Sequence, residues 1–192
     1  MKISSAKLIE EMIAITEHSR NAAEKFKSLD NFHLNFKQNP PSWSILECIE
    51  HLNLYGDFYL PEIGKQLINQ KNANKSTFFK SGILGNYFAN LMKVQNGKIR
   101  KMKSPKDKDP STSELNFTTI DRFLKQLNLL KSLLHQAESV DLTKTKTAIS
   151  LSPLIKLRLG DTLRFFVFHI ERHLLQASRV LENSEVKEKL LH

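Results

Sequence analysis

The sequence predicts an all-α fold, a four-helix bundle with a long crossover connection between its second and third helices. Four segments repeat apolar residues at three- and four-residue spacing, which is the pattern of amphipathic helices. The 192 residues include only six Gly and six Pro, few for a loop-rich β protein, and no strand pattern of comparable strength appears. We therefore expect residues 1–192 to form a single helical domain.

The first helix is expected from about Ser4 to Leu29, before a break in residues 30–41 that ends in Asn-Pro-Pro. The second helix has the clearest start in the chain. Ser44 and Glu47 form an S-x-x-E capping box, in which each side chain accepts a hydrogen bond from the other residue's backbone N–H. Trp43 precedes the cap in the position of a hydrophobic staple.

This second helix should extend to about Asn69, although Pro61 is expected to kink or interrupt it. Residues 71–117 then form the long connection, which contains a short amphipathic helix candidate in residues 78–94. We expect that candidate to cover the apolar seam of the bundle rather than to contact a membrane surface. The connection is long enough that the helices it joins need not be antiparallel neighbours.

The third helix is expected from about Thr118 to Glu138, where leucine, isoleucine and phenylalanine keep helical phase. An irregular stretch in residues 141–159 should lead into the last helix. That helix is expected from about Asp161 to Leu181 or slightly beyond, and its apolar residues extend almost all round it.

The net charge of +9 is concentrated in one part of the chain. Residues 63–106 contain ten Lys or Arg and no Asp or Glu. Such a block can attract phosphate or anionic lipid, but it is more often a solvated surface. Anion or nucleic-acid binding through residues 63–106 therefore stays open as one alternative function, although no recognised nucleic-acid motif accompanies the charge, and we expect no nucleic-acid partner.

The location of the protein is expected to be cytoplasmic. No targeting segment is visible, and no apolar run approaches the roughly 18 to 20 residues that span a bilayer. Cys48 is the only cysteine, so an internal disulfide is excluded, and we expect it to be a small core residue.

Two histidines on the last helix, His169 and His173, stand at i and i+4 and so lie on one side of that helix. Helical phase places both beside the apolar face. The pair alone is weak evidence for a metal, since such histidines often bond only to a neighbour. His51 lies at the edge of the apolar stripe of the second helix and is a candidate third ligand, or else an interior histidine bonded to a backbone carbonyl. Tyr55, one turn later, could line the mouth of a pocket or pack in the core.

The two helices together resemble the DinB-like superfamily, metal-binding four-helix bundles also called YfiT-like. Residues 43–52 match the pattern W-S-x-x-E-x-x-x-H-L, and residues 169–176 match H-x-x-R-H-x-x-Q. The order and spacing of the motifs cover nearly the whole chain. One departure is Arg158, where a Thr or Ser often caps the last helix, so we expect a different start, with Asp161 as a candidate cap.

The resemblance implies that His51, His169 and His173 bind one divalent metal ion, with zinc or nickel the first candidates. It also implies that Gln176 supports the ligands from outside the coordination shell. Glu47 matches the family glutamate, but its role in the capping box already explains it. Family members are often dimeric. Some are thiol S-transferases that use low-molecular-weight thiols, another branch includes maleylpyruvate isomerases, and many have no assigned activity.

Three neutral imidazoles leave the charge of a divalent ion uncompensated and at least one coordination position open, as in catalytic sites. Such an ion can lower the pKa of a bound water or activate a thiolate. The leading hypothesis is therefore a metal-dependent transferase or hydrolase acting on a small molecule, with a low-molecular-weight thiol as a candidate substrate. The alternative is a module that holds the metal without turnover, for sensing or storage. The sequence does not identify the substrate.

Overall fold

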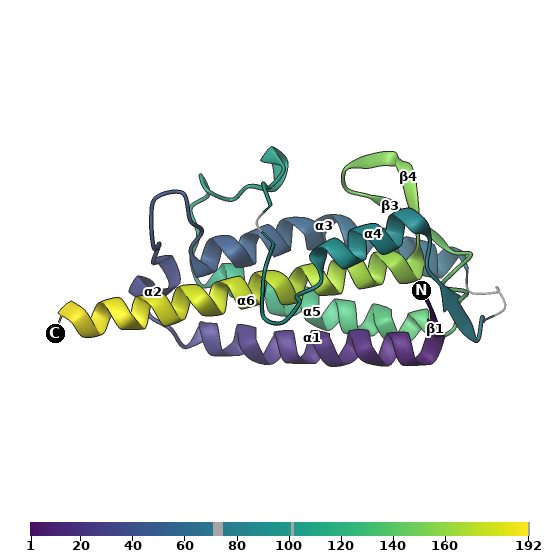
Figure 1. Ribbon diagram of the computed structural model, residues 1–192, viewed down its shortest axis with the longest axis horizontal. Helices are drawn as coiled ribbons and strands as arrows, with labels where there is room; N and C mark the ends of the chain where they lie inside the picture. Colours follow the sequence, from purple (N-terminus) through teal and green to yellow (C-terminus); the bar gives the residue numbers. More distant parts are fainter. Residues whose placement is uncertain (71–74, 101, 192) are drawn as a thin grey trace.

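The computed structural model describes residues 1–70, 75–100 and 102–191. Four long helices make up the body of the molecule and lie alongside one another (Figure 1). They are α1 (Ser5–Lys27), α3 (Ile45–Asn69), α5 (Thr118–Ala137) and α6 (Leu159–Leu191). The prediction of an all-helical bundle is confirmed, and all four helices begin within two residues of their predicted starts.

The crossover connection changes the order of the helices around the bundle. Helix α3 packs against α5 and α6, and α1 packs against the same two helices, so α1 lies diagonally opposite α3. In Figure 1, α1 and α6 run from right to left, while α3 and α5 run from left to right. The neighbours α3 and α5 are therefore parallel, which requires a connection that returns along the length of the bundle.

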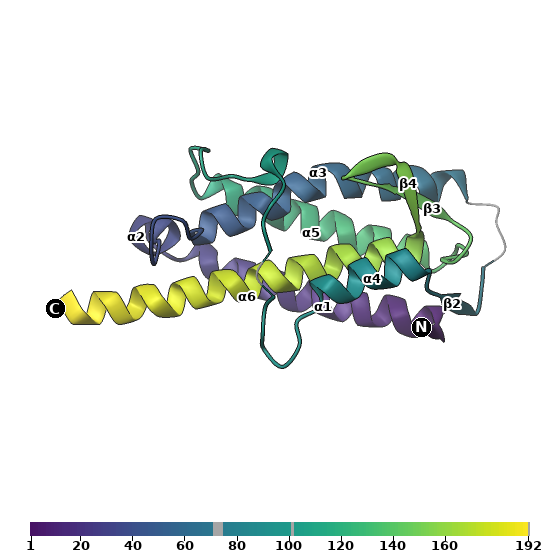
Figure 2. The ribbon, with the colours of Figure 1, turned by 45° about the horizontal axis from the view of Figure 1, so that its top comes forward.

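That connection returns through α4 (Ile83–Met92), which packs on the outside of α6 (Figure 2). Gly85 of α4 lies directly against Asp161 of α6, where an added Cβ would come within 2.5 Å of the carboxylate. The Asp161 side chain accepts hydrogen bonds from the hydroxyl of Ser81 and from the backbone N–H of Gly82. Arg164, one turn along α6, pairs with this carboxylate at 3.4 Å. A buried ion pair therefore fastens α4 to the bundle.

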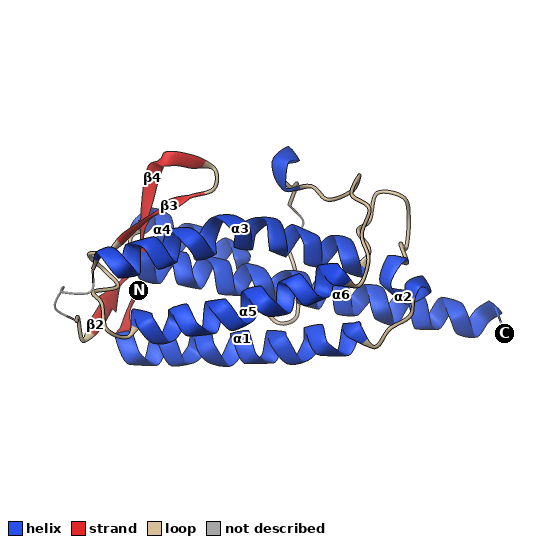
Figure 3. Ribbon diagram, turned by 180° about the vertical axis from the view of Figure 1, so that it is seen from behind, coloured by secondary structure: helices blue, strands red, loops and turns tan. Residues whose placement is uncertain are grey.

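Two short antiparallel strand pairs, which the sequence pattern did not predict, lie at one end of the bundle (Figure 3). Strand β1 (Lys2–Ser4) pairs antiparallel with β2 (Phe78–Lys80), with Ile3 opposite Phe79. Strand β3 (Lys146–Ile149) pairs antiparallel with β4 (Ser152–Arg158), with an irregularity after Ala148. The helix candidate at residues 78–94 is thus partly wrong, because its first residues form β2 and only α4 is helical.

The expected start of the last helix is also corrected. Asp161 does not cap α6 but lies within its first turn, with its carboxylate bonded toward α4. The free backbone N–H groups of Leu159 and Gly160 donate instead to the carbonyls of Thr145 and Leu142. At its other end α6 runs to Leu191, about ten residues farther than predicted.

The remaining predicted boundaries need smaller changes. A five-residue helix, α2 (Asn31–Asn35), forms inside the predicted break, with the Asp30 side chain accepting from the N–H of His33. Helix α3 continues through Pro61 without an interruption. A single 3₁₀ turn, η1 (Lys106–Lys108), lies in the connection before α5. Within the described residues, no helix is long and apolar enough to cross a membrane.

The interior of the bundle is apolar and closely packed, with buried leucine, isoleucine and phenylalanine from all four long helices. Cys48 is fully buried in this core as a free thiol, and burial raises the pKa of that thiol, so it is an inert core residue as predicted. Among these apolar residues the buried histidines of α3 and α6 are exceptions that require polar partners.

Candidate metal centre

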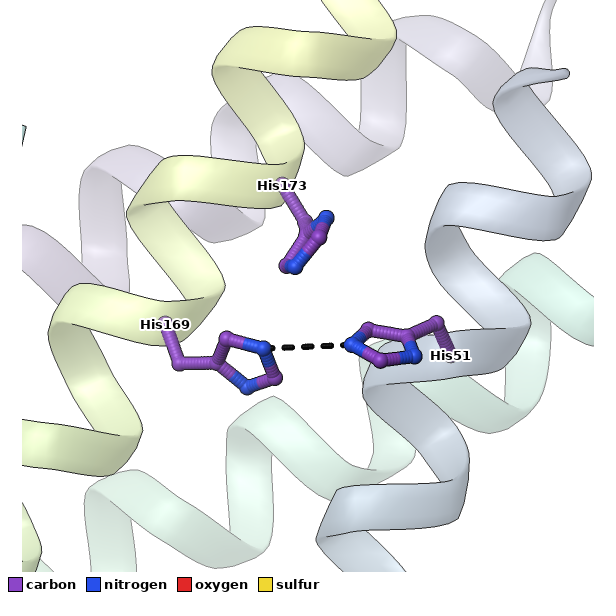
Figure 4. A group of neighbouring side chains, drawn as sticks. All are labelled: His51, His169 and His173. Atoms are coloured by element: carbon purple, nitrogen blue, oxygen red, sulfur yellow. Dashed lines mark hydrogen bonds between the residues drawn. The ribbon is translucent and has the colours of Figure 1, made fainter. Parts of the chain in front are cut away.

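Three histidines from two antiparallel helices meet in the interior of the bundle (Figure 4). His51 comes from α3, and His169 and His173 come from successive turns of α6. Each offers one ring nitrogen to a group of atoms that all lie within 4.8 Å of one another. The exposed fractions of the three side chains are 3%, 4% and 8%, so the group is covered on nearly all sides.

The local sequence explains why His51 points inward. The capping box forms as predicted, because the N–H of Glu47 donates to the Ser44 hydroxyl and the N–H of Ser44 donates to the Glu47 carboxylate at 2.8 Å. This fixes the first turn of α3 and with it the phase of the helix one turn later. The second Glu47 oxygen accepts a hydrogen bond from the Lys37 ammonium at 2.6 Å. Both oxygens therefore hold the start of α3, in agreement with a capping role for Glu47.

The tautomer of His51 follows from its outer hydrogen bond. Its Nδ1 lies 2.6 Å from the backbone carbonyl oxygen of Lys108. Since a carbonyl can only accept, Nδ1 carries the proton, and Nε2 presents its lone pair to the centre of the group. A carbonyl in this position is the usual outer partner of a metal-binding histidine.

Gln176 orients His173 in the same way. Its side-chain oxygen lies 3.1 Å from Nδ1 of His173 and accepts the proton of that nitrogen. The other nitrogen of His173 is then free to face the centre, as Figure 4 shows. The predicted supporting role of Gln176 thus has a contact of the expected kind.

Among the described residues, His169 has one hydrogen-bond partner, and it is another histidine. Its Nε2 lies 3.2 Å from Nε2 of His51, while its Nδ1 is buried without a hydrogen-bond partner among the described residues. An ion held by nitrogen ligands at about 2.0–2.1 Å in tetrahedral geometry separates those nitrogens by roughly 3.3 Å. The spacing of the two Nε2 atoms therefore fits two ligands of one ion.

Aromatic side chains form the walls around the imidazoles. Tyr55 lies with its ring centre 4.9 Å from that of His51 and 4.4 Å from that of His169. Trp43 packs on His51 at 4.7 Å and extends toward His173. Tyr55 is 7% exposed, and burial raises its pKa to about 12, so it stays a neutral phenol at ordinary pH. These walls keep water from the ring nitrogens.

Burial also keeps the three imidazoles neutral. Desolvation lowers the pKa of His51 to about 4, and the hydrogen bond to Lys108 offsets only part of this effect. Desolvation lowers the pKa values of His169 and His173 well below the ordinary range, and the other histidines lower them further. Neutral imidazoles are the form that binds a metal ion.

Charged side chains of both signs act on the centre: Asp109 raises the pKa of His51, and Lys108 and Arg172 lower it. Arg172, 5% exposed, donates to the backbone carbonyl of Arg100, and its charge helps to lower the pKa values of all three histidines. The group of candidate ligands contains no carboxylate or thiolate among the described residues. An ion at this centre would therefore keep its full charge.

The other described histidines lie outside the centre. His18 and His135 are exposed, and His33 sits between the carboxylates of Asp30 and Glu188. His192 lies outside the described residues. All the described basic residues of the 63–106 segment are exposed. They lie on the last turns of α3 and along the crossover connection.

The sequence did not indicate that some of the groups in contact with the histidines belong to the centre. Trp43 was interpreted only as a staple residue. Its position just before the helix that carries His51 could have indicated that it packs beside that histidine. The Lys108 carbonyl belongs to an irregular segment and gives no signal in the sequence. Tyr55, by contrast, lies where its spacing from His51 placed it.

A family model described as the DinB superfamily matches residues 14–177, which include the whole candidate centre. Neither the curated proteins nor the solved structures that were searched gave a match to this chain.

Proposed function

Because this chain belongs to the DinB superfamily, we propose that it is a metal-dependent enzyme that acts on a small molecule, as a thiol S-transferase or a hydrolase. The observation that carries the proposal is the ligand set of the centre. Three neutral imidazoles, with no acidic ligand beside them in the described part of the chain, could hold one divalent ion and leave a coordination position free. Closed structural sites instead use four protein ligands.

The residues of the chain would prepare the site in two ways. Lys108 and Gln176 accept the outer protons of His51 and His173 and so aim the free nitrogens at the centre. The aromatic walls exclude water. When bound, a zinc or nickel ion would supply Lewis acidity, which makes a thiol or a water molecule in the free position a better nucleophile.

The proposal is tested with the purified full chain loaded with Zn²⁺ or Ni²⁺ and without a histidine tag. Low-molecular-weight thiols are assayed against electrophilic acceptors, and ester and amide substrates are assayed for hydrolysis. His173→Ala is compared with His135→Ala, which removes an exposed histidine from α5. We expect turnover in the native chain and in His135→Ala but not in His173→Ala. Equal rates in all three proteins would refute the proposal.

A module that holds metal for sensing or storage is the other outcome of the same experiment. It predicts about one ion per chain, lost in His173→Ala, with no metal-dependent turnover on any substrate of the panel. The charge of the centre favours the enzyme. Storage and structural sites commonly neutralise the ion with thiolates or carboxylates, and none belongs to this group of ligands within the described residues.

A further inference from the structure

The segment Pro105–Ser111, here called the cover, lies across the outer side of the histidine triad. It contains η1, which packs on α3 and appears as the short teal turn above that helix in Figure 1. Lys108 places its carbonyl on His51 and its ammonium 6.0 Å from the centre of the Tyr55 ring. Ser111 accepts a hydrogen bond of 3.3 Å from the indole N–H of Trp43. The cover thus contacts two walls and one candidate ligand of the centre.

We propose that the cover is a lid that opens to admit the ion and its small-molecule ligand and closes over them. The inference rests on the metal centre of the proposed function. In the closed arrangement seen here, the three imidazoles are at most 8% exposed and Tyr55 is 7% exposed. At this exposure, neither a hydrated metal ion nor a small molecule can reach the ring nitrogens unless part of the surface moves.

The cover is the part of that surface that can move with the smallest loss of free energy. No residue of η1 is buried, and Pro110 is the only buried residue of the whole cover. Its backbone-to-backbone hydrogen bonds are local: Lys108 donates to Pro105, Asp109 donates to Lys106, and Pro110 accepts from Ser113. These bonds can survive opening, so the segment can lift as a unit. Segments with few buried apolar contacts open with the smallest free energy.

Closing the lid would also prepare the site. The Lys108 carbonyl is the acceptor that fixes the proton of His51 on Nδ1, so that Nε2 faces the centre. Opening removes this acceptor and frees the imidazole to change tautomer or turn. Closing also places the Lys108 side chain, 17% exposed, with its ammonium 6.0 Å from the centre of the Tyr55 ring. The lid would therefore couple enclosure of a ligand to the orientation of His51.

Trp43 provides a direct signal for the test, because it is the only tryptophan in the chain and packs on two of the imidazoles. Metal-free full-length protein is mixed rapidly with Ni²⁺, and the fluorescence of Trp43 is followed over a range of Ni²⁺ concentrations. Ser111→Ala removes the acceptor of the indole N–H, together with the hydrogen bond that the Ser111 hydroxyl donates to Asp109 within the cover. Ser113→Ala is the matched control, since that exposed serine lies just beyond the cover and its side chain makes no hydrogen bond in the described structure.

We expect the uptake rate of the native chain to reach a plateau set by opening. Ser111→Ala should raise that plateau about fivefold, the effect of losing the one hydrogen bond that joins the cover to Trp43, with the number of ions per chain unchanged. Ser113→Ala should match the native chain. Hydrogen exchange of the amides in residues 106–111 should be faster than that of α3 and should slow when Ni²⁺ binds.

Uptake rates that rise linearly with Ni²⁺ and are equal in both variants would overturn the lid while leaving the metal centre intact. Exchange of residues 106–111 as slow as that of α3 would do the same. A protein that binds no ion at equilibrium would overturn the proposed function and the lid together. Metal analysis at equilibrium therefore separates the two failures.

Discussion

Nε2 of His51 and Nε2 of His169 lie 3.2 Å apart, although 118 residues separate them in the sequence. Since Nδ1 of His51 carries its proton, its Nε2 is an acceptor that faces the nitrogen of the second ring. The contact is satisfied either by a proton on His169 or by an ion between the two nitrogens. The position of His173 beside both rings favours the ion, because a hydrogen bond joins only two nitrogens, whereas one ion can bind a nitrogen from each of the three rings.

The first prediction concerns the ligands themselves. His51→Ala and His169→Ala should each reduce bound Zn²⁺ or Ni²⁺ from about one ion per chain to near zero, because two remaining imidazoles hold an ion weakly. Metal analysis of protein purified without a tag measures this directly. His18→Ala, which removes an exposed histidine of α1, should retain the ion. A full complement of metal in His51→Ala would show that the ion binds elsewhere.

The second prediction concerns Gln176. Replacing it with leucine removes the acceptor of the His173 Nδ1 proton, so the imidazole loses its fixed orientation. We expect the affinity for the ion to fall about 10–100-fold, the usual effect of losing such a partner, as measured by competition with a chelator. Gln176→Glu keeps an acceptor in place and should retain most of the affinity. Equal affinities for the leucine variant and the native chain would remove Gln176 from the site.

The third prediction is the pH at which the ion is lost. Protons compete with the metal for each imidazole, and burial lowers the pKa of His51 from its ordinary value of 6.5 to about 4. Because a lower pKa means weaker competition, the loss should occur at lower pH than for an exposed histidine site. We expect full metal content at about pH 5.5 and loss nearer pH 4. Release of half the ion at about pH 6.5 would contradict this interpretation.

The parts of the site that the sequence predicts are those set by helical phase. The i, i+4 spacing orients His169 and His173, and the capping box fixes the phase of α3 and therefore of His51. The length of the connection likewise permits the parallel arrangement of α3 and α5. Each of these follows from residues a few positions apart or from a simple count.

The features that escaped prediction depend on contacts between distant segments. Strands of three or four residues, such as β1 and β3, are too short for an alternating pattern to stand out. Asp161 was expected as a helix cap, and the sequence did not reveal its actual partner, because Gly82 lies 79 residues away. The Lys108 carbonyl is a backbone atom in a segment without periodicity, so no side-chain pattern indicates its contact with His51.

The fourth prediction concerns the ion pair between Asp161 and Arg164. Asp161 is fully buried and Arg164 is 4% exposed, and the guanidinium also donates to the side chains of Asn86 and Asn90 on α4. Asp161→Ala leaves the buried cation without its carboxylate. We expect the free energy of unfolding to fall by about 3–5 kcal/mol, measured by urea denaturation with an unchanged slope.

Two further variants show whether the charge or the contact with α4 matters. Asp161→Ala combined with Arg164→Leu should recover part of the loss, because an apolar pair removes the cost of the unpaired charge. Glu24→Ala breaks the exposed pair with Arg20 and should change stability by less than about 1 kcal/mol. If Asp161→Ala cost no more than Glu24→Ala, the ion pair would not fasten α4 to the bundle. Since neither residue of the pair contacts the triad in the described structure, the folded Asp161→Ala protein should still bind one ion per chain, which separates stability from the metal centre.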